Sequence, residues 1–237
     1  MAEWARKRFW STVATEAIDE GYLVTLDGRP LRTPARQALA VPSLALAERI
    51  AAEWGGQPEV FDPATMPATR TANSAIDKVR GQQGEVAALV SSYGDSDLIC
   101  YRATAPRELV AREAAAWDPL VAWADARFGA RLTVWQGVMH HAQPPEALQA
   151  LHQPVAAMSA FELAAFHDLV ALSGSLVIGL AVREHLSAPE LLWEAAQVDE
   201  AWQIEQWGED AEASALTLGR NQAFLDAARF IDCLHTG

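Results

Sequence analysis

The alternation of apolar and polar residues near the start of the chain predicts β-strands. Runs at residues 9–14, 22–26 and 37–41 are rich in β-branched and aromatic side chains, which strands favour. Residues 19–21 separate the first two runs, and Asp27-Gly28, a dipeptide typical of tight hairpin turns, follows the second. Pro30 and Pro34 push the residues before them away from the helical region, so residues 29–34 are expected to be extended.

After residue 42 the apolar positions follow a helical spacing instead. Ser43 is placed to cap a helix that carries Leu46, Ile50 and Trp54 and ends at the glycine pair 55–56. Three prolines mark residues 57–68 as an irregular connector. Short strand-like runs at 98–101 and 132–135 could pair with each other. Apolar spacing predicts two further helices, one around the stripe formed by residues 72, 75, 76 and 79 and one around the stripe formed by residues 86, 89, 90 and 93. Other helices are expected at residues 106–128, 147–157, 160–172, 175–185, 189–198 and 219–234.

These elements predict an α+β protein of two domains. Residues 1–67 are expected to form a small β-rich N-terminal domain with one helix, and residues 68–237 a larger, mainly α-helical C-terminal domain. The longest apolar run, around residues 176–182, is far shorter than the roughly 20 residues that span a bilayer. The basic cluster at the N-terminus is not followed by an apolar segment, so a secretory signal is not expected. The chain is expected to be cytosolic, or a mature organellar form.

Acidic residues are concentrated in the second half of the chain. The net charge is −13; residues 1–118 hold 13 Lys and Arg against 16 Asp and Glu, whereas residues 119–237 hold 5 against 15. This balance disfavours nucleic acid and anionic lipid as partners, because both require a basic surface. A basic protein surface is a more natural partner for the acidic half.

Residues 199–213, called the acidic segment below, concentrate this charge. Asp199, Glu200, Glu205, Glu209, Asp210 and Glu212 surround two tryptophans, Trp202 and Trp207, and no Lys or Arg occurs between residues 186 and 219. Like charges on one helix destabilise it, so such a run suggests a surface kept for a partner. The alternative is an acidic helix that serves solubility only.

The apolar positions around the acidic segment predict a break in the helix. Leu191, Ala195, Val198 and Trp202 form one stripe that is expected to lie in the core. Ile204, Trp207 and Ala211 continue on a shifted face, which indicates a kink or a change of helix near Asp199.

Motifs of known enzymes are nearly absent from the sequence. Gly174 and Gly179 have the spacing of a phosphate-binding loop, but Leu180 and Ala181 stand where Lys and Ser or Thr are needed. We interpret these glycines as sites of close helix packing. The adjacent pair His140-His141 does not have the spacing of two zinc ligands and is interpreted as a surface or loop pair.

Three further groups of polar residues are interpreted as structural. Asp95 and Asp97 lack the other ligands of a calcium loop and are expected in a turn. Cys100 and Cys233 are far apart in apolar surroundings and are expected to be reduced thiols. Arg70, Asn73 and Asp77 would share one helix face, as capping groups or as a polar network or contact surface.

Taken together, the motifs resemble those of the assembly chaperones that bind the alpha subunit of the F-type ATP synthase, found in mitochondria and alpha-proteobacteria. The resemblance runs nearly end to end and rests on the combination of motifs. They are Lys7-Arg8-Phe9-Trp10, residues 26–34, Leu39-Ala40-Val41-Pro42, Ala51-Ala52-Glu53-Trp54, residues 66–70 and 73–77, residues 97–102, Trp117-Asp118-Pro119, Gly174-Ser175-Leu176-Val177, Asp199-Glu200 and Trp207-Gly208.

This resemblance implies the same two-domain α+β fold, no enzymatic activity, no cofactor and no metal. It implies binding to the free ATP synthase alpha subunit, shielding its beta-facing interface until the alpha–beta hexamer forms, by a protein expected to be a monomer. The Ala- and Arg-rich composition suits a bacterial member, so the cytoplasm is favoured, whereas a eukaryotic member would be in the mitochondrial matrix. The residues expected to bind the partner are Glu205 first, then Glu200, with Trp207, Asp210, Asp199 and Glu209.

Two other functions remain open at this point. One is a small enzyme with a cleft between the two domains that uses Arg70, Asp77 or His140, although neither a nucleophile nor a metal site is evident. The other is a general holdase, which would bind unrelated denatured proteins. Reversal of one charge, Glu205→Lys, should impair binding of the alpha subunit and leave the fold intact if the acidic segment is the binding surface.

Overall fold

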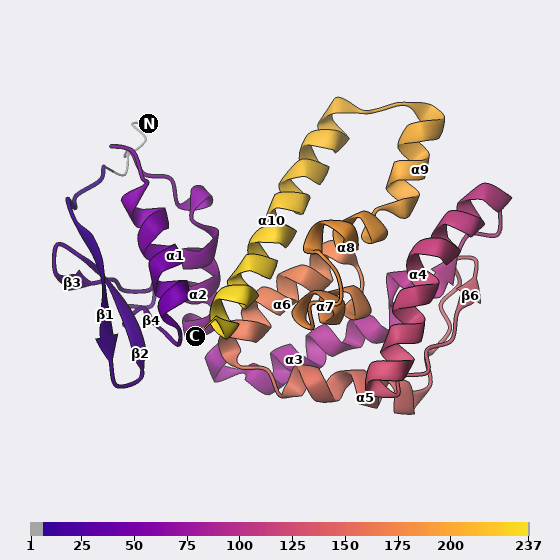
Figure 1. Cartoon of the computed structure of the whole chain (residues 1–237), viewed down its shortest axis with the longest axis horizontal. Coiled ribbons are helices and arrows are strands. Elements are labelled where there is room, and N and C mark those ends of the chain that lie inside the picture. The colour runs from indigo at the N-terminus through magenta and orange to yellow at the C-terminus, as the bar shows by residue number, and fades with distance from the viewer. Residues whose placement is uncertain (1–6, 237) are drawn as a thin grey trace. The chain divides into compact units, whose positions relative to one another are not determined.

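The computed structural model describes residues 7–236, so of the basic cluster at the N-terminus only Arg6 lies outside the described residues. Two compact units are present (Figure 1). The first comprises Met1–Gln83, Ser159–Ala165 and Arg229–Gly237, and the second comprises Gly84–Met158 and Phe166–Ala228. A strand-bearing N-terminal region precedes a helical C-terminal region, so the predicted α+β class is confirmed. The domain boundary at residue 67 stays a prediction.

An antiparallel sheet forms the N-terminal part of the first unit. Strand β2 (Gly21–Leu26) pairs with β1 (Val13–Ile18), β3 (Arg29–Pro30) and β4 (Ala40–Val41). The turn after β2 is tight because Asp27 and Gly28 both adopt left-handed backbone conformations, with φ of 48° and 74°. This confirms the hairpin predicted from the dipeptide.

The predicted boundaries of two strands are wrong. The first strand begins at Val13 and not at residue 9, because the carboxylate of Asp27 accepts the backbone N–H groups of Ser11 and Thr12 and holds them outside the β-ladder. Only Ala40–Val41 of the run at 37–41 pairs with β2. Gln37 instead donates its backbone N–H to the Thr33 hydroxyl.

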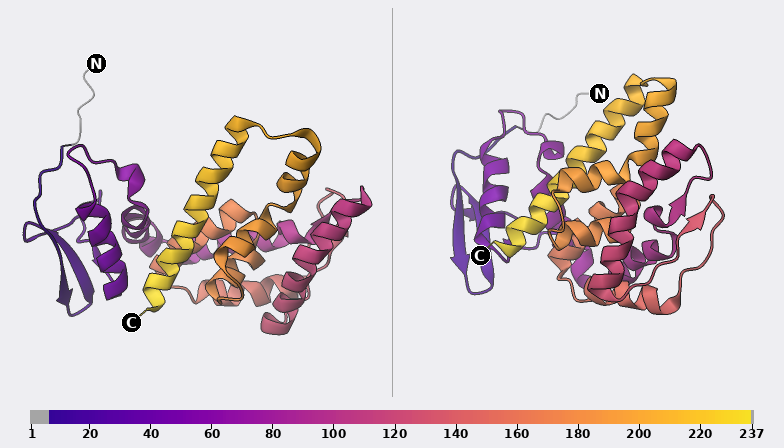
Figure 2. Two further views of the ribbon diagram at one scale, coloured as in Figure 1. Left: turned by 45° about the horizontal axis from the view of Figure 1, so that its top comes forward. Right: turned by 45° about the vertical axis from the view of Figure 1, so that its right-hand side comes forward.

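Helix α1 (Leu44–Gly55) packs against β1 and β2, as Figure 2 shows. The Ser43 hydroxyl accepts the backbone N–H of Leu46 at 3.3 Å, which confirms the predicted cap, and Gly56 ends the helix. Leu46 and Ile50 are fully buried. A short 3₁₀ turn, η1 (Pro63–Thr65), leads into α2 (Pro67–Asp77), which buries the alanines of the predicted stripe, and a second one, η2 (Val79–Gly81), follows α2.

The remaining helices lie mainly in the second unit, to which α6 and α10 both contribute only part of their length. They are α3 (Gln83–Ser91), α4 (Arg107–Phe128), α5 (Pro145–Ala156), α6 (Ala160–Ser173), α7 (Leu176–Arg183), α8 (Pro189–Ala196), α9 (Val198–Trp207) and α10 (Ala211–His235). Every residue of α7 from Leu176 to Val182 is buried. A Cβ atom at Gly179 would lie 2.7 Å from Val170 Cγ2, so the interpretation of this glycine as a packing site is confirmed.

Three predictions for the second unit need correction. Leu89, which belongs to the predicted stripe at residues 86, 89, 90 and 93, is 59% exposed, because the buried residues of α3 are Ala87 and Val90. The short strands do pair, in parallel, but as β5 (Tyr101–Arg102) and β6 (Trp135–Gln136), since Leu98–Cys100 forms the 3₁₀ turn η4. Helix α10 begins at Ala211 and not at residue 219, because the Asp210 carboxylate caps it by accepting backbone N–H groups of its first turn.

Asp97 is a buried structural carboxylate, as the turn interpretation implies. Its side chain accepts the backbone N–H of Ile99 at 3.3 Å and of Val177, in the first turn of α7, at 3.0 Å. Burial raises the pKa of Asp97 to about 6. Asp95 accepts the backbone N–H of Gln143 instead, so the two carboxylates have separate roles. Across residues 7–236, no group of three or more His, Cys, Asp and Glu side chains is arranged to hold a metal.

The remaining polar candidates also occupy structural positions. Asp77 accepts hydrogen bonds from the Thr33 hydroxyl at 2.6 Å and the Ala35 backbone N–H at 3.0 Å. His140 and His141 are both exposed in a loop, as predicted, with His141 stacked on Trp135 at 4.4 Å between ring centroids. Cys100 and Cys233 are free cysteines, as predicted.

Candidate partner-binding site

The acidic segment forms α9, a short connection and the start of α10, and α9 packs along α4 (Figure 1). Helix α8 ends at Ala196, and Gln197 departs from helical geometry with φ of −111° and ψ of 18°. The predicted change of helix near Asp199 is therefore confirmed. None of the residues Val198–Trp207 is fully buried, so side-chain contacts with α4 hold α9 in place.

The outer contact between α4 and α9 is an ion pair over an aromatic ring. Arg112 Nη1 donates to Glu205 Oε1 at 2.7 Å, and the guanidinium carbon lies 4.8 Å from the centre of the Trp202 ring. The hydrogen bond from Arg112 lowers the pKa of Glu205, and the same bond raises the pKa of Arg112. Glu205 is thus paired within the chain, and its charge is partly neutralised.

The inner contact is between two acidic side chains. Glu113, adjacent to Arg112, is only 1% exposed and accepts the backbone N–H of Ala103 at 2.8 Å. Burial raises the pKa of Glu113 to about 7, and a hydrogen bond and the charge of Asp199 act in the same direction. Asp199 is therefore turned toward α4, and the two carboxyl groups interact most favourably when one carries a proton.

Arg102 and Trp117 are buried beneath these contacts and support them. Buried Arg102 donates Nε–H to the Ile99 carbonyl at 3.0 Å, and its Nη1 lies 2.9 Å from an Asp118 carboxylate oxygen. Trp117 is fully buried and donates its indole N–H to the Ala195 carbonyl at 2.6 Å, which ties α4 to α8. The start of α9 is therefore held at a defined position relative to α4.

A groove of about 710 Å³ opens between these elements and is lined by β5, the residues after it, the start of α4 and α9. Its ionisable lining residues are Arg102, Glu113 and Asp199, and Trp202 and Trp207 supply aromatic surface. Trp207 is 78% exposed. The groove combines large apolar rings with ionisable groups of both signs, a composition that protein interfaces share.

The six residues expected from the sequence to bind a partner divide into three groups. Asp199, Glu205 and Trp207 are brought together with α4, whereas Glu200 and Glu209 are exposed and form no ion pair with any residue from 7 to 236. Asp210 caps α10.

Trp202 is half-buried beside Arg112, so its expected place in the core is wrong. Leu191, which belongs to the same predicted stripe, is also exposed and lines a groove. Helix α8 buries its neighbours Leu192 and Trp193 instead of Leu191.

Sequence reasoning missed Arg102, Arg112 and Glu113. A signal for Glu113 does exist: it falls at helical spacing with Leu109, Trp117 and Leu120 on the apolar side of α4, and a charged residue in such a position is informative. The pairing of Arg112 with Glu205 has no local signal.

Comparison with known proteins identifies the family of the chain. The family model described as "ATP12 chaperone protein" matches residues 7–125. The chain belongs to the ATP12 chaperone family. Atp12 from Paracoccus denitrificans, a solved structure, is 44% identical with a TM-score of 0.94, over 98% of this chain and 100% of that one. An Asp-to-Lys mutant of the same protein gives equal values.

A more distant ATP12 relative is the mitochondrial protein atp12 of Schizosaccharomyces pombe. It is 25% identical over 219 residues, which cover 86% of this chain and 75% of the relative. Membership of the ATP12 family supports a role as a chaperone in ATP synthase assembly. Over residues 7–236, no helix has the length and apolar character needed to cross a membrane.

Proposed function

We propose that this ATP12 chaperone binds the free alpha subunit of the ATP synthase and covers its beta-facing interface until the alpha–beta hexamer forms. An uncovered subunit interface is apolar and prone to aggregate, so a newly made subunit benefits from a temporary cover. The chaperone must later yield to the beta subunit, and an open surface groove permits such exchange. The proposal involves no chemical step and no cofactor. We place the protein in the cytoplasm of a bacterium, or in the mitochondrial matrix if it is eukaryotic.

The observation that carries this proposal is the outward face of α9. Trp207 is 78% exposed and Ile204 is 46% exposed on a helix that also bears Glu200. Large exposed aromatic residues are typical anchors of protein interfaces. The surrounding carboxylates would steer a basic partner surface toward them, an effect that salt weakens.

The six proposed site residues have different roles in this arrangement. Trp207, Glu200 and Glu209 are exposed and would contact the alpha subunit directly. Asp199 and Glu205 would act largely by holding α9 against α4, and Asp210 by capping α10. Reversal at Glu205 would also place a cation next to Arg112, so Glu200 is the sharper probe of direct contact.

The test measures complex formation with the alpha subunit by size-exclusion chromatography with light scattering. We expect a complex of the chaperone with alpha, and no complex with the beta subunit or an unrelated denatured protein. Glu200→Lys should weaken the complex and Glu85→Lys should not; both glutamates are exposed in the first turn of a helix, so the two variants carry a similar helix-dipole cost. Absence of a complex at low and moderate salt would refute the proposal, and binding of unrelated denatured proteins would indicate a general holdase.

A further inference from the structure

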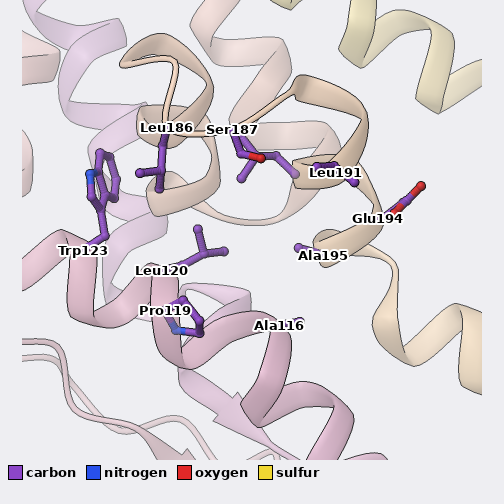
Figure 3. Close-up of a pocket in the computed structure, with 10 residues that line it drawn as sticks. Ala116, Pro119, Leu120, Trp123, Leu186, Ser187, Leu191, Glu194 and Ala195 are labelled. Carbon is purple, nitrogen blue, oxygen red and sulfur yellow. The ribbon is translucent and has the colours of Figure 1, made fainter.

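A second groove, of about 500 Å³, lies between α4 and α8 (Figure 3). Pro119, Leu120 and Trp123 line it from α4, and Leu186 and Leu191 line it from the connection before α8 and from α8 itself. The side chains labelled in Figure 3 are mostly apolar, and Trp123 adds its indole ring. The polar groups among them are the Ser187 hydroxyl and the Glu194 carboxylate.

Two leucines in this groove are exposed to solvent although the sequence pattern predicts burial for one of them. Leu191 is 57% exposed and Leu186 is 42% exposed. Apolar surface is less favourable in water than when it is buried. Exposed apolar residues that cluster in one concave place mark a site of interaction with another molecule, unlike single scattered ones.

Buried side chains and hydrogen bonds hold the base and sides of the groove in place. Leu120 and Leu192 are nearly fully buried beneath it, and the Trp117 indole N–H bonds the Ala195 carbonyl at 2.6 Å. Arg127, near the end of α4, donates Nε and Nη2 hydrogens to one oxygen of Glu184 at 3.0 and 2.8 Å. Arg127 is thus engaged in an ion pair within the chain, and the other oxygen of Glu184 pairs with Arg183 Nη1 at 3.0 Å.

The charge on the α8 side of the groove is negative. Glu194 lies at the rim with its carboxylate directed away from the apolar side chains (Figure 3), and Glu190 is exposed on the same helix. No Lys or Arg occurs between residues 186 and 219. A second copy of this chain, with a net charge of −13, would be repelled from such a rim, so charge complementarity points to a basic partner.

We propose that this groove holds an amphipathic helix of the client subunit, with apolar side chains seated between α4 and α8 and Lys or Arg facing Glu190 and Glu194. Two helices that flank an apolar trough are the usual receptor for such a ligand, which is anchored by residues at i, i+3, i+4 and i+7. That the client is the alpha subunit rests on the function proposed above. The groove is distinct from the one beside α9, so the chaperone would hold its client at two places.

The direct test uses a fluorescent synthetic helix of about 18 residues, with leucines on one face and lysines on the other, long enough to be helical. Binding to the full chain is measured by fluorescence anisotropy. We expect Leu191→Asp to weaken binding about tenfold or more, the loss of one interface anchor. Leu89→Asp is the matched control, since Leu89 is 59% exposed on α3, and should bind as the wild type does. A second variant, Ser187→Trp, should block the groove by filling it.

Three results would overturn the proposal: equal binding by the Leu191→Asp and wild-type chains, equal loss in Leu89→Asp, or equal binding of a control peptide with glutamate in place of lysine. The same variants are then tested against the alpha subunit. A wild-type complex with alpha that Leu191→Asp leaves unchanged would refute the client groove but keep the proposed function. Failure of wild type itself to bind alpha would refute the proposed function, while the peptide still tests the groove.

Discussion

Arg112 on α4 and Glu205 on α9 are 93 positions apart in the sequence, and their side chains are joined by a hydrogen bond of 2.7 Å. Together with the cation–π contact of Arg112 on Trp202, this bond fixes a helix that has no fully buried residue of its own. Arg112 thus supplies the outer contact by which a different helix holds the acidic segment.

We expect removal of this ion pair to loosen α9 without unfolding the protein. Both side chains are about half exposed, so the midpoint of denaturant unfolding should change little in Arg112→Gln or Glu205→Gln. Amide hydrogen exchange of residues 198–207 should become faster in both variants, because α9 loses its outer contact. The double variant should exchange no faster than either single one; additive effects would mean that the two residues act separately.

Glu113 should make the stability of the protein depend on pH. Its pKa in the folded state, about 7, is above its ordinary value of 4.5, so between these pH values the folded state binds more protons than the unfolded state. Stability therefore falls as pH rises through this window. Glu113→Gln has no such titration, so the wild type should lose stability relative to the variant between about pH 5 and pH 8.

The measurement for Glu113 is urea unfolding of both proteins at several pH values. Taking the difference between them removes the contribution of Asp97, whose pKa is also raised and which both proteins retain. Asp199→Asn should reduce the pH dependence because it removes a neighbouring charge. Parallel curves for the wild type and Glu113→Gln would contradict the raised pKa.

Asp97→Ala should be among the most destabilising single substitutions in this chain. It leaves two buried backbone N–H groups, of Ile99 and Val177, without an acceptor. An unsatisfied buried donor costs about 1–3 kcal/mol, so we expect a loss of about 3 kcal/mol or more. Urea unfolding measures it. Asp125→Ala, at a surface carboxylate that pairs with the exposed Arg131, should cost less, and an equal loss in both would indicate a general effect.

Gly179→Ala should destabilise the second unit by overpacking. The added methyl group would lie 2.7 Å from Val170 Cγ2 and 3.1 Å from Phe166 Cε2, both buried. Such overpacking costs about 1–3 kcal/mol. Gly219→Ala in α10 is the matched control, because nothing lies within 4 Å of its added methyl group, and helix propensity predicts a gain of up to about 1 kcal/mol. Thermal unfolding of the two variants should therefore shift in opposite directions.

The sequence predicts those features that depend on neighbouring residues. Ser43 caps α1 through a residue three positions away, and Asp27-Gly28 forms its turn through its own backbone preferences. The break between α8 and α9 also follows from apolar positions that move to another face of the helix. These features are encoded within one or two turns of chain.

Features that depend on distant residues could not be predicted in this way. Helical spacing places Leu89 and Trp202 on apolar faces but does not tell whether another element covers them, and the structure leaves both partly exposed. The start of β1 depends on the carboxylate of Asp27, which lies beyond the next strand. The partners of Glu205 and Asp199 both lie on α4, so the division of the acidic segment into inward and outward residues appears only in the folded chain.

The absence of a fully buried residue in α9 has a consequence for the evolution of this surface. Substitutions at the outward positions of Val198–Trp207 change what the helix presents without opening a cavity in the core. A lineage whose client subunit drifts in sequence can therefore adjust this helix residue by residue, while α6 and α7 maintain the fold unchanged. If α9 contacts the client as proposed, this part of the binding surface can vary separately from the residues that maintain the fold.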